Sequence, residues 1–199
     1  MSFWAENYGE VDSSGSPIAT NPKRDFRFKI EFQNMSKLTS YGTNGLWYAK
    51  TSDKPSFSLG EATHAFLNHT FKFPGRVSWS DVTITMVDPG PGSNAKNSGL
   101  AIALAKMLKE SGYIVPAGPK SDYQTISKSK AVSAIGVVRI TQLSPDGTEI
   151  EAWVLHNAFL TDAKFGTLSY GSEELTEYSL TLKYDWADYE ELPYQESSS

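Results

Sequence analysis

Cysteine is absent from the 199 residues of this chain, and so are long hydrophobic runs. Without a thiol, the chain can form no disulfide framework, no cysteine-based zinc site and no cysteine nucleophile. No run approaches eighteen consecutive apolar residues, and Met1–Glu6 has no basic segment followed by an apolar stretch. These absences argue against a membrane-spanning helix and a secretory signal, so we expect the protein in the cytoplasm in which it is made.

A basic excess is also missing, because 18 Lys and Arg stand against 23 Asp and Glu, giving a formal net charge of −5. Proteins that hold nucleic acid usually carry positive charge, since much of their affinity comes from neutralising phosphates. The charge balance therefore disfavours an ordinary DNA- or RNA-binding role. A mildly acidic protein could still handle DNA by not adhering to it.

Catalytic and metal-binding patterns are scarce as well. His64 and His69 are five residues apart in a strand-like segment, so we expect them on opposite faces, where they could not easily share a metal. No zinc-protease, Walker A or dinucleotide-binding motif occurs, and Ser169 misses the Gly-x-Ser-x-Gly pattern by one residue. Glu149 and Glu151 fit the polar face of a strand, although spacing alone leaves a glycosidase pair open. We predict no catalytic residue, no metal site and no cofactor.

Aromatic residues, in contrast, make up 13% of the chain, and 15 Gly and 10 Pro punctuate it. Alternating aromatic and β-branched segments between turn formers are typical of β structure. In 24–33, for example, Phe26, Phe28, Ile30 and Phe32 alternate with polar residues and predict a strand with one buried face. Strands are predicted at 24–33, 46–50, 64–73, 79–87, 135–143, 149–159 and 176–186, with an extended segment at 55–59.

A single helix is predicted at about 95–111, ended by Gly112 and followed by a long polar loop at 113–131. Its apolar stripe consists of Leu100, Leu104, Met107 and Leu108. These elements predict a mainly β fold, an antiparallel sandwich or rolled barrel with one packed α-helix. We expect one domain at 23–188, a polar N-terminal arm at 1–22, and a disordered acidic tail at 189–199.

Two parts of the sequence carry a resemblance. In 66–88, an alternating strand leads through the bend at Pro74-Gly75 to a second strand that ends at Asp88. In 148–160 and 174–186, a strand with its turn and then an aromatic-rich last strand follow. This order resembles the tail tube proteins of contractile-tailed, T-even-like bacteriophages, which are related to the tubes of contractile injection systems. The matched parts span about 24–187. The arm at 1–22 and the connections at 34–45 and 113–131 depart from the family pattern in being longer.

The resemblance implies a structural virion protein. Six subunits would form a ring, each lending strands to a continuous β-barrel, and stacked rings would form a tube whose channel conducts DNA without binding it specifically. The implied partners are further copies of the chain, the tail sheath protein, the baseplate tube-initiator and the tail terminator, with no membrane and no cofactor. The implied location is the virion tail, assembled in the host cytoplasm.

Two physical expectations accompany this resemblance. Ring closure would cover the strand edges of such a subunit, and acidic strand faces would repel phosphate in the channel. A hairpin between Leu46 and Phe73 could reach the next ring. The candidates for contact between rings, which fit a core position equally well, are Phe57, Leu59 and Phe66. The candidates for the lumen are Glu149, Glu151, Asp162, Glu173 and Glu174.

Three alternatives to a phage tail tube stay open. An inner tube protein of a phage-like contractile injection system would have the same ring and no DNA to pass. A baseplate tube-initiator would share the domain, although such proteins often carry extra domains. A monomeric ligand-binding or enzymatic β-barrel is the alternative from a different class, and it would show an occupied pocket.

Overall fold

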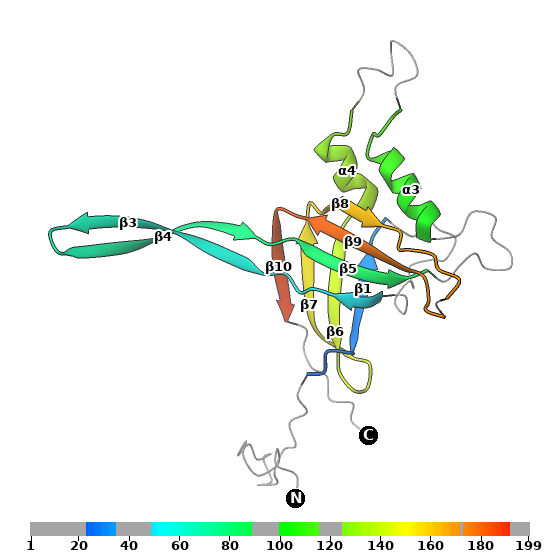
Figure 1. Cartoon of the computed structure of the whole chain (residues 1–199). Helices are drawn as coiled ribbons and strands as arrows, with labels where there is room; N and C mark the ends of the chain where they lie inside the picture. Colours follow the sequence, from blue (N-terminus) through cyan, green and yellow to red (C-terminus); the bar gives the residue numbers. More distant parts are fainter. Residues whose placement is uncertain (1–22, 35–48, 89–99, 116–124, 172, 192–199) are drawn as a thin grey trace, which may run out of the picture.

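The computed structural model describes residues 23–34, 49–88, 100–115, 125–171 and 173–191. Two four-stranded antiparallel sheets form the body, two helices lie at one end of it, and a long hairpin projects from its side (Figure 1). The predicted mainly β, antiparallel fold is therefore confirmed. Outside the described residues lie the predicted arm at 1–22, nearly all of the connection at 34–45, the start of the strand at 46–50, the start of the helix at 95–111, part of the loop at 113–131 and most of the tail at 189–199.

The first sheet consists, in spatial order, of β1 (Phe28–Phe32), β6 (Val138–Leu143), β7 (Glu149–His156) and β10 (Trp186–Glu191). Its buried face follows from the alternation of apolar residues along each strand. One row of directly paired, buried residues crosses all four strands and consists of Phe32, Val138, Leu155 and Ala187. β1 and β10 are the edges of this sheet.

The second sheet consists, in spatial order, of β2 (Ala49–Ser52), β5 (Val82–Val87), β9 (Glu177–Lys183) and β8 (Phe159–Lys164). Val82 pairs with Leu182 and Ile84 with Leu180, and all four side chains are fully buried. These strands cross those of the first sheet in Figure 1, and the buried residues of both sheets form one cluster. Each such aliphatic side chain contributes about 1.5–3 kcal/mol through burial, so this cluster holds the two sheets together.

Two helices close one end of the core, α3 (Leu100–Glu110) and α4 (Lys128–Ile135). α3 confirms the predicted helix over its described residues and buries Leu100, Leu104 and Met107, whereas Leu108 at the edge of the stripe is exposed. α4 corrects the prediction of one helix, because it begins inside the predicted loop at 113–131. Its first turn is capped by the Ser127 hydroxyl, which accepts a hydrogen bond from the Lys130 N–H.

The predicted strand at 64–73 is wrong. The structure has two antiparallel strands there, β3 (Phe57–Phe66) and β4 (His69–Trp79), joined by a tight turn at Leu67-Asn68. The alternation of Leu67, His69, Phe71 and Phe73 with polar residues starts at the turn itself and hides it, and neither turn residue is a glycine or proline. Leu67 adopts a left-handed backbone conformation with φ of 51°, which sequence patterns rarely reveal for leucine. The predicted strand at 79–87 is likewise divided, because Trp79 ends β4 and β5 begins at Val82.

The predicted strand at 176–186 also divides, into β9 and β10. Between them the Asp185 N–H donates to the carbonyl oxygen of His156, and the Asp185 carboxylate accepts hydrogen bonds from Lys128 and Asn157. These contacts turn the chain from the second sheet into the first. β10 then runs to Glu191, so the predicted domain boundary at 188 falls inside a strand.

Candidate assembly surfaces

Every residue of the β3–β4 hairpin except Trp79 is exposed, and the hairpin extends well beyond the body (Figure 1). The three predicted ring-contact residues all lie on β3, where Phe57, Leu59 and Phe66 are 57%, 58% and 62% exposed. In the single chain they are therefore surface residues and not core. Exposed aromatic and aliphatic side chains on a projecting ribbon are typical of a surface that another protein covers.

The pairing register divides the hairpin into two halves. Near the body, Phe57 pairs with Trp79 and Leu59 with Val77, so these apolar side chains share one face. The register then shifts at a β-bulge between Leu59 and Glu61. Beyond the bulge, strand alternation places the apolar side chains on the opposite face. We call this second group the distal patch; it consists of Ala62, His64, Phe66, His69, Phe71 and Phe73.

Two glycines make the bulge sterically possible. A Cβ atom at Gly75 would lie 2.8 Å from the carbonyl carbon of Gly60 and 2.9 Å from its oxygen, which is closer than real Cβ contacts allow. A Cβ at Gly60 would meet its nearest atom, the Arg76 carbonyl oxygen, at 3.6 Å, an ordinary contact. Gly75 is therefore the residue that the bulge requires, and the exchange of faces along the hairpin depends on it.

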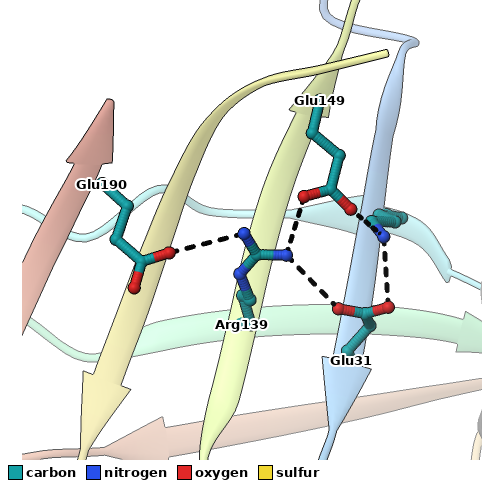
Figure 2. Close-up of polar contacts among 5 residues, drawn as sticks. Glu31, Arg139, Glu149 and Glu190 are labelled. Atoms are coloured by element: carbon teal, nitrogen blue, oxygen red, sulfur yellow. Dashed lines mark hydrogen bonds and ion pairs between the residues drawn. The ribbon is translucent and has the colours of Figure 1, made fainter. Parts of the chain in front are cut away.

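A charged network covers the outward face of the first sheet (Figure 2). Arg139 on β6 lies at its centre, with Nη1 at 2.9 Å from Glu149 and 3.7 Å from Glu31, and Nη2 at 3.4 Å from Glu190. Lys29 on β1 completes it by pairing with both Glu31 and Glu149. The network thus links β1, β6, β7 and β10 across the whole sheet.

The ion pairs of this network shift the pKa values of its members. The hydrogen bond from Lys29 is the main cause that holds the pKa of Glu149 below its ordinary value, and Arg139 adds to it. Burial alone would lower the pKa of Arg139, but its hydrogen bonds to Glu149 and Glu190 raise it above the ordinary value. The same face carries Asp188, whose carboxylate lies 2.8 Å from His156 Nε2. Arg27, which strand alternation places beside Lys29 and Glu31, is a third cation on this face, so four carboxylates against three cations leave it with a small acidic excess.

A second polar cluster lies on the inward side of the first sheet, around Glu151. Its side chain is only 7% exposed and pairs with Lys23, next to β1, and with Lys54, at the base of the hairpin. Lys54 also donates to the side chain of Gln142 at 2.7 Å. Burial alone would raise the pKa of Glu151, but the hydrogen bonds from Lys23 and Lys54 outweigh it and hold the pKa below its ordinary value. The cluster therefore fastens the hairpin base to the first sheet.

A cavity of about 640 Å³ lies beside the connection between β8 and β9. Its wall runs from Gly166 to Tyr170 and from Glu174 to Glu177, and its exposed apolar side chains are Leu168, Tyr170 and Leu175. Gly166 shapes the start of this wall, because it has a φ of 71° and a Cβ there would lie 2.7 Å from the Glu177 carbonyl oxygen. Glu177 also pairs with Lys50 on β2.

Comparison with solved structures finds chains with a similar overall fold. A chain of the anti-feeding prophage tube-terminating cap matches with a TM-score of 0.59 at 16% identity, over 92% of this chain and 100% of that one. A chain of the PVC sheath-tube complex, from an extracellular contractile injection system, matches with a TM-score of 0.56 at 15% identity, over 92% and 100%. A chain of the anti-feeding prophage baseplate matches with a TM-score of 0.57 at 15% identity, over 86% and 97%.

This chain has the fold of contractile injection system proteins. The predicted resemblance to tail tube proteins and to the tubes of these systems is confirmed at the level of the fold. No protein-family model and no curated protein matches the sequence.

Within this injection-system fold, the five predicted lumen residues do not share one surface. Glu149 lies in the charged network, whereas Glu151 points to the inward side. A register shift between β6 and β7 beside Glu149 separates these two glutamates, which simple alternation would place together. Asp162 lies on β8 of the second sheet, at 3.5 Å from Lys164, and Glu173 and Glu174 lie in the β8–β9 connection.

Sequence reasoning missed the other members of the charged network, namely Lys29, Glu31, Arg139 and Glu190, and also Asp188 on the same face. The alternating charges of 27–33 were a usable signal, but their partners lie more than a hundred residues away. In the described ranges, no group of three or more histidine and acidic residues is placed to hold a metal ion. No helix in those same ranges is long and apolar enough to cross a membrane.

Proposed function

We propose that this chain is a tube subunit of a contractile tail, in which six copies close a ring and rings stack into a channel. The observation that carries the proposal is the first sheet, which has two edges and an acidic outward face. In a ring, β1 of one copy would pair with β10 of the next, which removes both edges. The outward faces of six sheets would then line the lumen.

The charge of that face supports a channel for DNA, as in a bacteriophage tail. An acidic wall repels phosphate and lets the duplex slide without adhering. We place the lumen at the outward face of the first sheet, which carries Glu31, Glu149 and Glu190 of the charged network and also Asp188. The predicted candidate Glu149 belongs to this face. The other four acidic residues predicted for the lumen, at positions 151, 162, 173 and 174, lie on other surfaces of the single chain.

The hairpin supports the stacking of rings, since it projects from the body with an apolar surface. The further partners proposed are a sheath protein around the tube, a baseplate initiator and a tail terminator, with assembly in the host cytoplasm. The role is structural and not catalytic. A second candidate is a tube-terminating or baseplate component, because chains of a cap and of a baseplate share the fold.

The deciding experiment is light scattering after size exclusion, combined with negative-stain microscopy of the purified chain. A hexamer of six 21.9 kDa chains would have a mass of about 131 kDa and appear as a ring with a central hole. Rings that also elongate into tubes support the tube subunit, whereas rings that never elongate favour the terminator or baseplate role. A chain that stays monomeric at high concentration and fails to polymerise on a tail baseplate contradicts both.

A further inference from the structure

The two free edges of the first sheet, β1 and β10, leave backbone groups without a neighbouring strand. On β1, the Arg27 carbonyl oxygen accepts from the Leu143 N–H, and the Gln33 N–H donates to the Val137 carbonyl oxygen, both at 2.9 Å. The odd-numbered residues of β1 therefore bond to β6. Since the direction of hydrogen bonding alternates along an antiparallel strand, the N–H and C=O groups at the open edge belong to Phe28, Ile30 and Phe32.

The same alternation determines the open edge of β10. β6 pairs with β7 without a shift from Val138 to Gln142, and β7 pairs with β10 without a shift from Trp186 to Glu191. Within each strand, the residues that bond to one neighbouring strand alternate with those that bond to the other. Even-numbered residues of β10 therefore bond to β7, and its open edge carries the N–H and C=O groups of Ala187 and Tyr189.

The open-edge residues of both strands direct their side chains to the inward face of the sheet. They lie in the core cluster, pack against it, or, for Tyr189, pack on Trp153 with ring centroids 5.0 Å apart; the others are Phe28, Ile30, Phe32 and Ala187. A β10 strand can thus bond to β1 of a second copy while the inward faces of the two copies continue into each other. Had the edges differed, the charged face of one copy would adjoin the apolar face of the next.

Charge distinguishes among the registers that keep this match, which differ by steps of two residues. One of them sets Glu190 opposite Arg27 and Asp188 opposite Lys29. Strand alternation places all four side chains on the outward face, so two pairs of opposite charge would meet there. Directly opposed residues of opposite charge stabilise adjacent strands, and like charges destabilise them.

The neighbouring registers are less favourable. A displacement by two residues in one direction sets Asp188 opposite Glu31, and further displacement in that direction brings two glutamates opposite each other. Displacement in the other direction sets Lys29 opposite Trp186, the first residue of β10, so only Phe28 and Lys29 of β1 would still face a strand. One register therefore combines a long contact with matched charges.

Arg27 is the cation of the outward face that makes no ion pair among the described residues. Its guanidinium lies over the Phe26 ring, 5.1 Å from the centroid. At the opposite edge of the sheet, Glu190 contacts Arg139 only at 3.4 Å and its side chain is 49% exposed. Cations at β1 and acids at β10 are thus separated by the width of the sheet within one copy, but adjoin between two copies.

We propose that β10 of one copy pairs with β1 of the next in the register that sets Glu190 opposite Arg27, and that these two residues form an ion pair between copies. This inference rests on the proposed function, which supplies the ring. Arg27 thereby continues the charged network of one copy into its neighbour. On the inward face, the same register sets Tyr189 opposite Phe28, which lines an apolar cavity of about 490 Å³, so an aromatic contact accompanies the ion pair.

Cysteine cross-linking tests the register, because the chain has no native cysteine. Directly opposed residues that are not hydrogen-bonded have Cα atoms about 4.5 Å apart, within the range of a disulfide. Under mild oxidation, rings assembled from a mixture of Arg27→Cys and Glu190→Cys chains should give a covalent dimer that neither variant gives alone. Lys29→Cys is the matched control, since diagonal neighbours are about 7–8 Å apart and should not cross-link to Glu190→Cys.

The outcomes separate the register from the ring. A dimer from Lys29→Cys with Glu190→Cys, or rings in which neither pair cross-links, overturns the register and leaves the ring proposal intact. An unmodified chain that forms no ring overturns the proposed function and the register together. Thermal unfolding of each variant shows whether the body is folded.

Charge reversal supplies the second readout. Arg27→Glu and Glu190→Arg each set like charges opposite each other at every contact, so each should raise the concentration needed for rings on the order of tenfold. In a ring that alternates the two variants, the substituted residues face each other at every second contact and the native residues at the rest. A mixture should therefore form rings at the concentration of the unmodified chain.

The matched control for charge reversal is Arg76→Glu on the hairpin, because Arg76 also makes no ion pair among the described residues. It should leave the concentration needed for rings unchanged. Single variants that assemble as readily as the unmodified chain, or a mixture that assembles no better than the single variants, would overturn the pairing of Arg27 with Glu190.

Discussion

Glu149 and Glu151 stand two positions apart in one strand but belong to different surfaces of the sheet. Glu149 shares Lys29 and Arg139 on the outward face, whereas Glu151 is buried between Lys23 and Lys54 on the inward face. The register shift beside Glu149 produces this separation. Sequence alternation predicts the strand correctly but treats both glutamates as equivalent, because a bulge of one residue leaves no mark in the pattern.

Glu151→Gln should lower the stability of the folded chain in a pH-dependent way. The pKa of Glu151 is depressed in the folded state, so its ion pairs stabilise the fold above the ordinary pKa of 4.5 and are lost as the pH falls through the folded value. We expect a loss of about 1–2 kcal/mol at pH 7, because two charge-assisted hydrogen bonds are weakened. Urea unfolding of the dilute monomer between pH 7 and pH 3 measures it. A difference from the unmodified chain that does not shrink below pH 4.5 would contradict the role of the charge.

Arg139→Ala should destabilise the first sheet by about 1–2 kcal/mol, because it leaves Glu31, Glu149 and Glu190 with fewer cations. The effect is electrostatic and partly exposed to solvent, so about 1 M NaCl should reduce it. Arg76→Ala removes an arginine that makes no ion pair among the described residues and is the matched control. Unfolding free energies at low and high salt provide the measurement, and an equal loss in both variants would refute the network.

The elements show which parts of the fold the sequence determines on its own. Strand alternation predicts β1, β5, β6, β7 and β9 because one face of each lies in the core and the other does not. Alternation does not predict the two strands of the hairpin, because both of its faces are exposed in the single chain. Its turn at Leu67-Asn68 also has no glycine or proline to mark it. The sequence pattern does not predict α4 either, because the helix is mostly polar and buries only Ala134 and Ile135.

Gly75→Ala should damage the hairpin without unfolding the body. The added methyl group would overlap the backbone of Gly60, at a cost of about 1–3 kcal/mol to the bulge. Since the bulge sets the face on which the distal patch lies, we expect rings to form but few tubes. Gly60→Ala makes only ordinary contacts and is the matched control.

Microscopy of assemblies and thermal unfolding of the monomer test this pair of glycine variants together. Both variants should keep the cooperative unfolding transition of the body. Gly60→Ala should lie within about 0.5 kcal/mol of the unmodified chain, and Gly75→Ala should lose no more than the cost of about 1–3 kcal/mol at the bulge. Normal tubes from Gly75→Ala would mean that the exchange of faces does not matter for stacking.

The whole molecule depends on pairings that no local pattern contains. β1 and β6 are separated by more than a hundred residues, and the chain enters the second sheet and leaves it again before β10 closes the first. This arrangement puts the first and last described strands at opposite edges of one sheet. Each edge exposes backbone groups that a neighbouring strand could satisfy. The predicted fold class followed from composition and alternation, but the two edges, on which ring formation depends, emerge only from the topology.

Hydrogen exchange during assembly tests those edges. If β1 of one copy pairs with β10 of the next, amides of both strands that face outward in the monomer gain partners, and their exchange should slow on the order of tenfold or more. The central strands β6 and β7 are already paired on both sides and should change little, which makes them the internal reference. β2 and β8, at the edges of the second sheet, should also change less than β1 and β10. Protection confined to β3 and β4 would mean that the hairpin alone holds copies together, and the first sheet would then line no closed channel.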